Sequence, residues 1–267
     1  MKFIPNQKRS KPSNIVQSIE KAAEILDKLK RYPEGASLGE ISHDVDQSKG
    51  TVHRLLATLT YLDFVRQDPV TKNYRLGFKL CELGNIVLGQ LDLRNAARPF
   101  LDDLANRVRE TVHLVVLDYD EALYIDKVEI RRKQSGLQMV SRIGGRIPLH
   151  STSVGKILLA SLPNETIDGI ITSKGLVRKT ANTITDPDVL KRHLEIVKKE
   201  GVAFDNEENE AGVRCVAATI FDMKGAVAAS VSISGPAIRV SEDDIRNQLQ
   251  NEIRKTAMEI SKALGYQ

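Results

Sequence analysis

Residues 37–62, SLGEISHDVDQSKGTVHRLLATLTYL, decide the fold of the N-terminal part of this chain. Leu38, Ile41 and Val45 recur at helical spacing, and polar residues 46 and 47 end this first apolar pattern. A second helical period follows at once, and its apolar side is formed by Val52, Leu55, Leu56, Leu59 and Leu62. Ser48 is placed to cap this second period, because its hydroxyl can accept a hydrogen bond from the amide of residue 51. The stretch therefore predicts a helix, a tight turn and a second helix.

The outer face of the second helix is polar and cationic. A DNA recognition helix needs such a face, because its first residues meet base edges and phosphates in the major groove. The predicted DNA contacts of this helix are Ser48, Lys49, Thr51, His53 and Arg54. The alternative is a two-helix corner of an ordinary helical domain, since short motifs of this kind also occur without DNA binding.

Two flanking segments would complete a winged helix-turn-helix domain over residues 14–77. Residues 64–76, FVRQDPVTKNYRL, predict two short strands around a polar turn, where Arg66, Lys72 and Arg75 are placed to meet phosphates. Upstream, a first helix of about 17 residues would cover the other two helices. Its apolar stripe would consist of Ile15, Ile19, Ala22, Leu26 and Leu29. Among the wing residues, Arg66 and Lys72 are the predicted DNA contacts.

Charge and cysteine content limit the class of protein. The chain has 267 residues and a net charge of +4, which is modest for a protein that coats nucleic acid without sequence choice. Its two cysteines, Cys81 and Cys215, lie far apart, which excludes a disulfide scaffold and a zinc finger and fits a reducing cytoplasm. No apolar run approaches the ~20 residues of a transmembrane helix. We therefore expect a cytoplasmic protein with no membrane partner.

Residues 1–13 form a basic arm that contains Lys2, Lys8, Arg9 and Lys11. A flexible terminus without function is one interpretation of such a segment. The other is an arm that follows the DNA backbone or enters a minor groove.

Residues 78–92 predict a linker helix between two domains. Leu80, Leu83, Val87 and Leu91 recur in near-heptad order. This helix could pack on its own domain, or it could form a seam between two protomers. A homodimer would read two half-sites, so we expect a palindromic double-stranded DNA operator. Association into a tetramer stays open.

Residues 93–267 alternate between helical and strand-like patterns. The predicted strands are 111–117, 122–128, 135–143, 202–205, 214–221 and 226–234, and the predicted helices are 92–109, 152–162, 165–173, 186–199 and one that opens at residue 241. Asp186-Pro187 is typical of a helix start, with Asp at the N-cap and Pro in the first turn. We expect an α+β chain whose second domain is a GAF-like antiparallel sheet flanked by helices.

Four stretches resemble one known family. They are NIVQSIEKAAEILDKL (14–29), SKGTVHRLLATL (48–59), RIGGRIPLHSTSVGKILLASLP (142–163) and GVAFDNEENEAGVRCVAATIFDMKGAVAASVSISGP (201–236). Together they are similar to the winged helix and the effector domain of IclR-family transcription regulators. Within that family, residues 110–129 (ETVHLVVLDYDEALYIDKVE) and 141–156 (SRIGGRIPLHSTSVGK) are most similar to the KdgR-type regulators of sugar-acid catabolism.

The resemblance implies a pocket for a small anionic metabolite that carries a carboxylate. The implied effector-binding residues are Gly144, Gly145, His150, Ser151, Ser153, Asp205, Cys215, Ser232 and Ser234. Their chemistry is suitable, because Ser232 and Ser234 share one side of a strand and a helix N-terminus at 151–153 favours an anion. Read from the residues alone, the serines could instead face solvent, and Cys215 could be an ordinary buried residue.

These observations predict a DNA-binding transcriptional regulator, and specifically a repressor, of a carbon-catabolic operon. A small carboxylate metabolite, such as a sugar acid or 2-keto acid, would control this regulator. The enzyme alternative is a hydrolase with Cys215 as nucleophile and His150 as base, which needs both side chains within hydrogen-bond reach. A constitutive DNA-binding protein is the third possibility. We expect no catalytic residues, no metal site and no cofactor.

Overall fold

The computed structural model describes residues 12–90, 92–130 and 141–267. Within these residues the chain divides into two compact units, and the division falls between residues 90 and 91. The domain limits expected from the sequence, 14–77, 78–92 and 93–267, remain a prediction.

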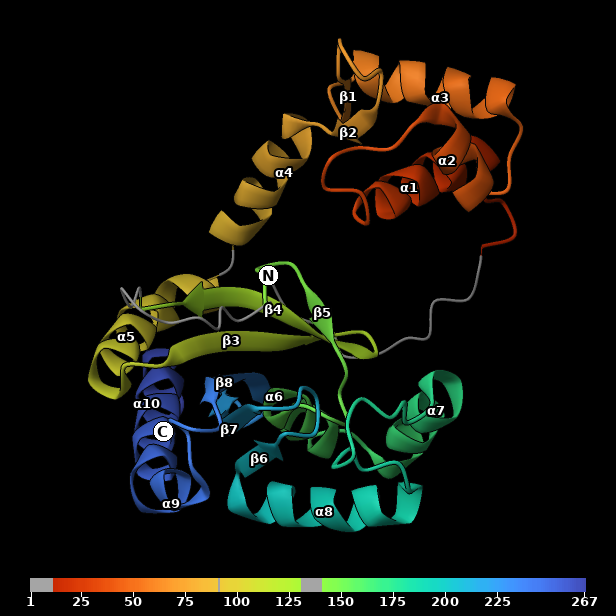
Figure 1. Cartoon of the computed structure of the whole chain (residues 1–267). Helices are drawn as coiled ribbons and strands as arrows, with labels where there is room; N and C mark the ends of the chain where they lie inside the picture. Colours follow the sequence, from red (N-terminus) through yellow and green to blue (C-terminus); the bar gives the residue numbers. More distant parts are fainter. Residues whose placement is uncertain (1–11, 91, 131–140) are drawn as a thin grey trace. The chain divides into compact units, whose positions relative to one another are not determined.

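The N-terminal unit contains three helices and a hairpin, followed by a further helix (Figure 1). Its elements are α1 (Gln17–Leu29), α2 (Leu38–Asp44), α3 (Lys49–Tyr61), β1 (Val65–Gln67), β2 (Tyr74–Leu76) and α4 (Phe78–Gly89). Ser37 and Glu40 form a capping box at the start of α2, and the Ser48 hydroxyl accepts the amide of Thr51 at the start of α3. The predicted helix, turn and helix are therefore confirmed.

The prediction for the first helix was wrong in length and in the first part of its face, whereas Ala22, Leu26 and Leu29 of the predicted stripe do pack in the core. Helix α1 has 13 residues, and Ile15 precedes it. Ile15 and Ile19 are 37% and 68% exposed, whereas Ile25 is fully buried beside Leu29. The buried face is thus set by the Ile25–Leu29 pair, four residues apart, which contacts α2 and α3.

The C-terminal unit is built on an antiparallel sheet, whose described strands follow the order β5-β4-β3-β8-β7-β6. The strands are β3 (Thr111–Asp118), β4 (Glu121–Val128), β5 (Arg146–Ile147), β6 (Val202–Asn206), β7 (Val213–Phe221) and β8 (Val227–Pro236). The predicted strand at 135–143 lies outside the described residues over 135–140, and residues 141–143 are not in a strand. The short edge strand β5 was not predicted.

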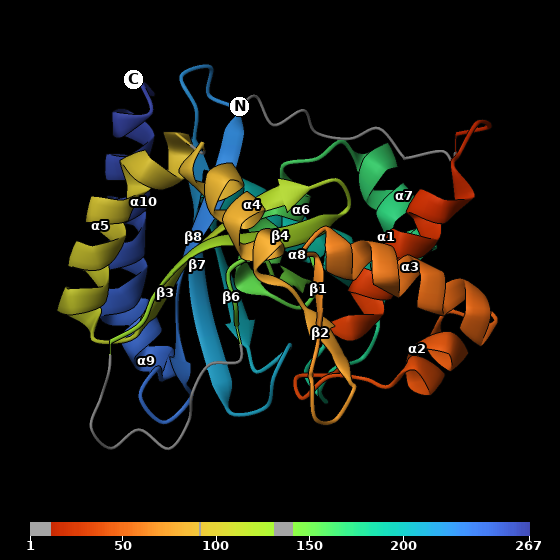
Figure 2. The ribbon, with the colours of Figure 1, turned by 90° about the horizontal axis from the view of Figure 1, so that it is seen from above.

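Helices cover both faces of this sheet (Figures 1 and 2). Helices α5 (Asp92–Val108) and α10 (Gln250–Ala263) lie side by side on one face, and α6 (Ser153–Ala160) lies on the other with α8 (Pro187–Glu200) beneath it. Helix α7 (Asn164–Lys174) packs near α6, and α9 (Glu242–Asp244) leads through a π-helical turn, Ile245–Leu249, into α10. The expected α+β architecture, with an antiparallel sheet between helices, is confirmed; its GAF-like character remains a prediction.

Capping residues and glycine explain where helix α8 begins and ends. Asp186 caps α8 by accepting the amides of Asp188 and Val189, and Gly201 ends that helix in the left-handed region. Helix α5 continues through Pro99, which lies inside it. In the part of the chain that the structure describes, no helix is long and apolar enough to cross a membrane.

Candidate functional site

The exposed side of α3 gathers the predicted DNA contacts. Val52, Leu56 and Leu59 turn inward and are buried, so the intervening positions face solvent. The exposed set contains every residue predicted for this helix, namely Ser48, Lys49, Thr51, His53 and Arg54. The side chains lie on the first two turns, where the free amides and the positive end of the helix dipole also favour phosphate.

The three cations of the β1–β2 hairpin differ in their surroundings. Asp68 organises the turn by accepting the amides of Val70 and Thr71 at 2.9 and 2.8 Å. Its other oxygen accepts a hydrogen bond from Arg75 at 3.1 Å, so the charge of Arg75 is compensated. The Arg66 guanidinium lies 4.3 Å from the centre of the Phe78 ring. Lys72 is exposed at the tip, with a φ of 60°. Lys72 is therefore the wing cation best placed for a phosphate.

A cavity of about 400 Å³ in the C-terminal unit brings together most of the predicted effector residues. It is bounded by the ends of β6, β7 and β8, the start of α6 and the segment that leads into β5. The predicted residues that line it are Gly145, Ser153, Asp205, Cys215, Ser232 and Ser234. Other hydroxyl groups in the lining belong to Tyr124, Ser141 and Thr152. A volume near 400 Å³ is in the range of small-molecule sites.

Three predicted effector residues do not line this cavity. Gly144 occupies a turn with a φ of +80°. Ser151 is buried, and its hydroxyl donates to Asn209 Oδ1 at 3.2 Å. It therefore helps to position Asn209, which lines the cavity. His150 lines a separate cavity, where its Nε2 lies 3.1 Å from the carbonyl oxygen of Val177.

The strand register explains why the two serines meet. Ser232 and Ser234 are two residues apart on β8, so their side chains share one face of the sheet. Ser232 pairs with His113 of β3, and Ser234 pairs with Cys215 of β7. The His113 Nδ1 atom lies 3.3 Å from Ser234 Oγ and 3.5 Å from Ser232 Oγ. His113 therefore lies within hydrogen-bond distance of both serines. It was not among the residues predicted from the sequence. The available signal was a polar residue between two apolar ones, Val112 and Leu114.

Asp205 is held in the cavity by backbone amides. Its Oδ1 accepts the amides of Glu208 at 2.7 Å and Asn209 at 3.4 Å, and only 3% of the residue is exposed. Burial raises the pKa of Asp205 to about 7, and the neighbouring Glu208 acts in the same direction, against the lowering effect of the two amides and of Lys156. Asp205 can therefore carry a proton near neutral pH and donate it to an oxygen in the cavity.

A buried ion pair fixes the β6–β7 loop against α6. The fully buried Lys156 Nζ donates to Glu208 Oε1 at 2.6 Å and lies 3.5 Å from His193 Nε2. Burial is the main cause that lowers the pKa of His193 to about 4, and Lys156 adds to it, so this ring is neutral and its Nε2 can accept. Sequence reasoning also missed Lys156, although a lysine within GKILLA interrupts an apolar helix.

Cys215 and His150 do not form the dyad that a hydrolase would need. They line different cavities. Burial raises the pKa of the Cys215 thiol, which disfavours the thiolate that a nucleophile requires. The geometry of these two residues therefore gives no support to the enzyme alternative.

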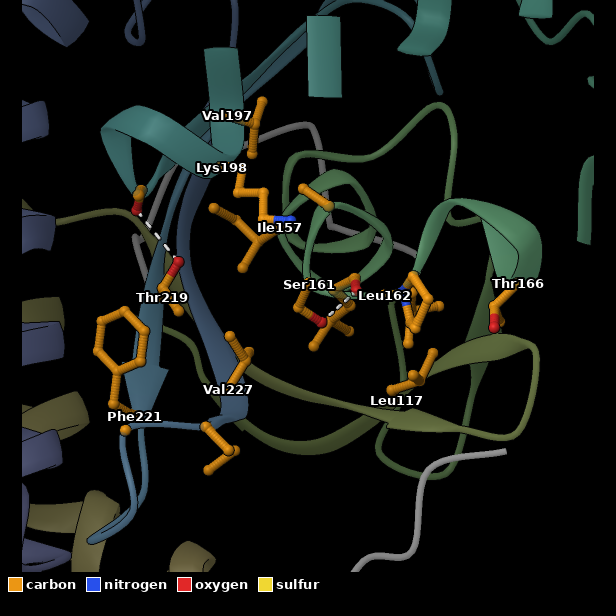
Figure 3. Close-up of a pocket in the computed structure, with 17 residues that line it drawn as sticks. Leu117, Ile157, Ser161, Leu162, Thr166, Val197, Lys198, Thr219, Phe221 and Val227 are labelled. Atoms are coloured by element: carbon orange, nitrogen blue, oxygen red, sulfur yellow. Dashed lines mark hydrogen bonds between the residues drawn. The ribbon is translucent and has the colours of Figure 1, made fainter. Parts of the chain in front are cut away.

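A larger cavity, of about 640 Å³, lies at the other end of α6 (Figure 3). Its lining is mainly apolar and includes Leu117, Ile157, Leu162, Val197, Phe221 and Val227. Two of its hydroxyls already donate to the backbone, Ser161 to the Leu158 carbonyl and Thr219 to the Gly201 carbonyl. It lacks the converging polar groups that fix a small anion, so the smaller cavity is the better candidate site.

Comparison with known proteins agrees with this geometry. The IclR helix-turn-helix domain matches residues 18–69, and the C-terminal domain of the bacterial transcriptional regulator IclR matches residues 85–262. The chain belongs to the IclR family. The regulator KdgR of Dickeya chrysanthemi is 39% identical over 256 residues, which cover 96% of this chain and 82% of that protein.

Two further IclR-family proteins match along nearly the whole chain. The regulator XynR of Escherichia coli K12 is 35% identical over 252 residues, covering 94% of this chain and 98% of that protein. The crystal structure of the Thermotoga maritima IclR is 41% identical, with a TM-score of 0.74 over 94% of this chain and 99% of that one. This IclR-family protein is accordingly a DNA-binding transcriptional regulator with a winged helix-turn-helix and a C-terminal effector domain, as the sequence predicted.

Proposed function

We propose that this IclR-family protein is a homodimeric repressor of a carbon-catabolic operon and that a small carboxylate metabolite controls its binding to the operator DNA. Relatives named as the transcriptional repressor AllR, for example in Salmonella typhi, are 34% identical over 261 residues, which supports repression. As a DNA-binding protein it would work in the cytoplasm.

The cavity supports a hydroxylated or keto carboxylic acid as effector. Its lining combines serine and threonine hydroxyls with the N-terminal turn of α6, which suits a carboxylate. Asp205, whose pKa is raised to about 7, can donate to a hydroxyl or carbonyl oxygen while protonated. The resemblance to KdgR-type regulators favours sugar acids and 2-keto acids within this class.

Helix α4 supports dimerisation. It is rich in apolar residues, yet none of them is buried. Leu83 and Val87, from the predicted seam, are 40% and 54% exposed. Leu91, the last residue of that seam, lies outside the described residues. A dimer through α4 would cover these side chains and present two α3 helices to a palindromic operator.

A paired serine experiment tests the effector assignment. The purified protein is screened by thermal shift against sugar acids and 2-keto acids, because a binder at 100 times its Kd adds about 2.7 kcal/mol of stability. Ser234→Ala should weaken the binder roughly 10- to 100-fold, as loss of a hydrogen bond to a charged group does, while operator binding without effector stays intact. Ser230→Ala is the matched control, because Ser230 is a buried serine of β8 that donates to the Ala218 carbonyl and does not line the cavity.

The outcomes separate the alternatives. Equal ligand affinity in the two serine variants would refute the assignment of the cavity. Operator binding that no carboxylate alters, together with no thermal shift, would favour a constitutive DNA-binding protein. Turnover of an ester by the isolated protein, abolished by Cys215→Ala, would favour the hydrolase.

A further inference from the structure

His113 has an unusual position for a histidine. It lies on the central strand β3, is 1% exposed, and its ring centre is 4.9 Å from that of Tyr124, which lines the cavity. Burial, reinforced by Lys127, lowers the pKa of His113 to about 3, so the ring is neutral at physiological pH. A neutral imidazole has one donor and one acceptor, and a hydroxyl group lies near each nitrogen.

The contacts of the ring connect three serines. Nε2 lies 2.8 Å from Ser141 Oγ, while Nδ1 faces Ser234 Oγ at 3.3 Å and Ser232 Oγ at 3.5 Å. All three serines line the candidate cavity. The tautomer of His113 therefore decides which of these hydroxyl groups can donate to a molecule inside it.

The two tautomers give the cavity opposite characters. With the proton on Nε2, the bare Nδ1 accepts a hydrogen bond from one serine of the pair, which leaves at most one hydroxyl to donate into the cavity. With the proton on Nδ1, the ring donates to a serine oxygen, and neither hydroxyl has to donate to the ring. The two Oγ atoms lie 3.5 Å apart, a long contact that a ligand oxygen between them would replace. In that second state Ser141 donates to Nε2 and presents only lone pairs to the cavity.

Resting on the function proposed above, we propose that His113 is a specificity-determining residue of this cavity. Its Nδ1–H tautomer makes Ser232 and Ser234 a pair of donors for a carboxylate and makes Ser141 an acceptor for a hydroxyl of the same ligand. The site then selects a hydroxylated carboxylate over its uncharged amide, because an amide offers one acceptor oxygen in place of two and adds an N–H facing a donor.

Spectroscopy of the ligand-free protein tests the tautomer directly. Long-range ¹H–¹⁵N spectra of the histidine-labelled full-length chain should show a protonated Nδ1 and a bare Nε2 for His113, unchanged between pH 5 and 8. The His113 signals are assigned by their loss in His113→Asn. A protonated Nε2 beside a bare Nδ1, or a charged ring, would overturn the proposal.

Two amide variants test the consequence for binding. Asn places an amide where Nδ1 stands and can still donate to the serine pair, whereas Gln reaches toward Ser141 and leaves the pair unsupported. With D-glucuronate and D-gluconate as probes, and glucuronamide and gluconamide as uncharged counterparts, His113→Asn should bind within about threefold of wild type. His113→Gln should lose roughly tenfold or more for the acids and lose the preference for acid over amide.

Each outcome has a separate meaning. Melting temperature and effector-free operator binding show that both variants fold. Equal acid affinity in folded His113→Asn and His113→Gln would refute the role of His113. If wild type binds neither acid, these two acids are not its effectors; the thermal-shift screen then decides the effector class of the proposed function, and the tautomer spectrum decides the proposal for His113.

Discussion

Asp205→Asn should make the stability of this protein less dependent on pH. The asparagine keeps an oxygen for the amides of Glu208 and Asn209, but it cannot ionise. In wild type, the folded state holds a proton on Asp205, whose pKa is about 7, whereas the unfolded chain releases it near the ordinary value of 3.8. Raising the pH therefore favours unfolding of wild type through this group, and the penalty is complete only above pH 7.

The magnitude follows from the shift. Each pKa unit corresponds to about 1.4 kcal/mol, so a carboxyl raised from 3.8 to about 7 costs about 4 kcal/mol when fully ionised. Because slightly more than one unit, about 1.7 kcal/mol, is already lost by pH 5, the difference between pH 5 and pH 8 is about 2.5 kcal/mol. The variant should gain this amount on wild type over that interval.

Urea unfolding at pH 5, 6, 7 and 8 measures the difference, since all other titrating groups are shared by the two proteins. The gap in unfolding free energy between variant and wild type should widen steadily and level off above pH 7. Parallel pH profiles would refute the argument that Asp205 is protonated in the folded state. Glu207→Gln is a control, because Glu207 lies two residues from Asp205 but is partly exposed and paired with Arg214.

Three further predictions concern DNA, assembly and the buried ion pair. Arg54→Ala should lose about 1–3 kcal/mol of operator-binding free energy if Arg54 reads a base. Lys72→Ala should weaken binding to operator and random DNA alike and lower the slope of log affinity against log salt by about one. Gel shifts at several salt concentrations measure both effects, and unchanged binding in both variants would contradict the placement of these residues. Leu83→Asp should give a monomer in sedimentation at micromolar concentration, and a dimer identical to wild type would exclude the α4 seam. Lys156→Met should lower the free energy of unfolding, measured in urea, by about 3–5 kcal/mol, because it leaves the buried Glu208 carboxylate without its partner. The double variant Lys156→Met with Glu208→Gln should recover part of this loss. No recovery would show that the broken ion pair is not the cause.

Elements with local signals could be predicted from the sequence. The caps at Ser48 and Asp186 and the β7–β8 hairpin are where the residues indicated them, because their hydrogen bonds connect residues a few positions apart. Ile19 was wrongly assigned to the buried face of α1, because Ile19 and Ile25 have equal apolar character. Only the position of α2 and α3 decides which of them is covered.

The candidate site was harder to predict where its contacts cross the sheet. Ser232 and Ser234 alternate visibly, so their shared face could be inferred from β8 alone. His113 meets them only because β3 pairs with β8, across more than a hundred residues of sequence, and no local pattern encodes that pairing. Likewise, Lys156 meets Glu208 through the packing of α6 against the β6–β7 loop.

The pairing of β3 with β8 also has a consequence during synthesis on the ribosome, because the sheet cannot form until β8 has been made. The N-terminal unit ends at residue 90, whereas β8 ends at Pro236. Synthesis at roughly 5–20 residues per second would separate these two points by roughly 7–30 s. During that interval the nascent polypeptide holds a finished DNA-reading unit, while the sheet that forms the cavity still lacks its middle. The residues of the metabolite cavity are thus complete only after those of the helix-turn-helix unit.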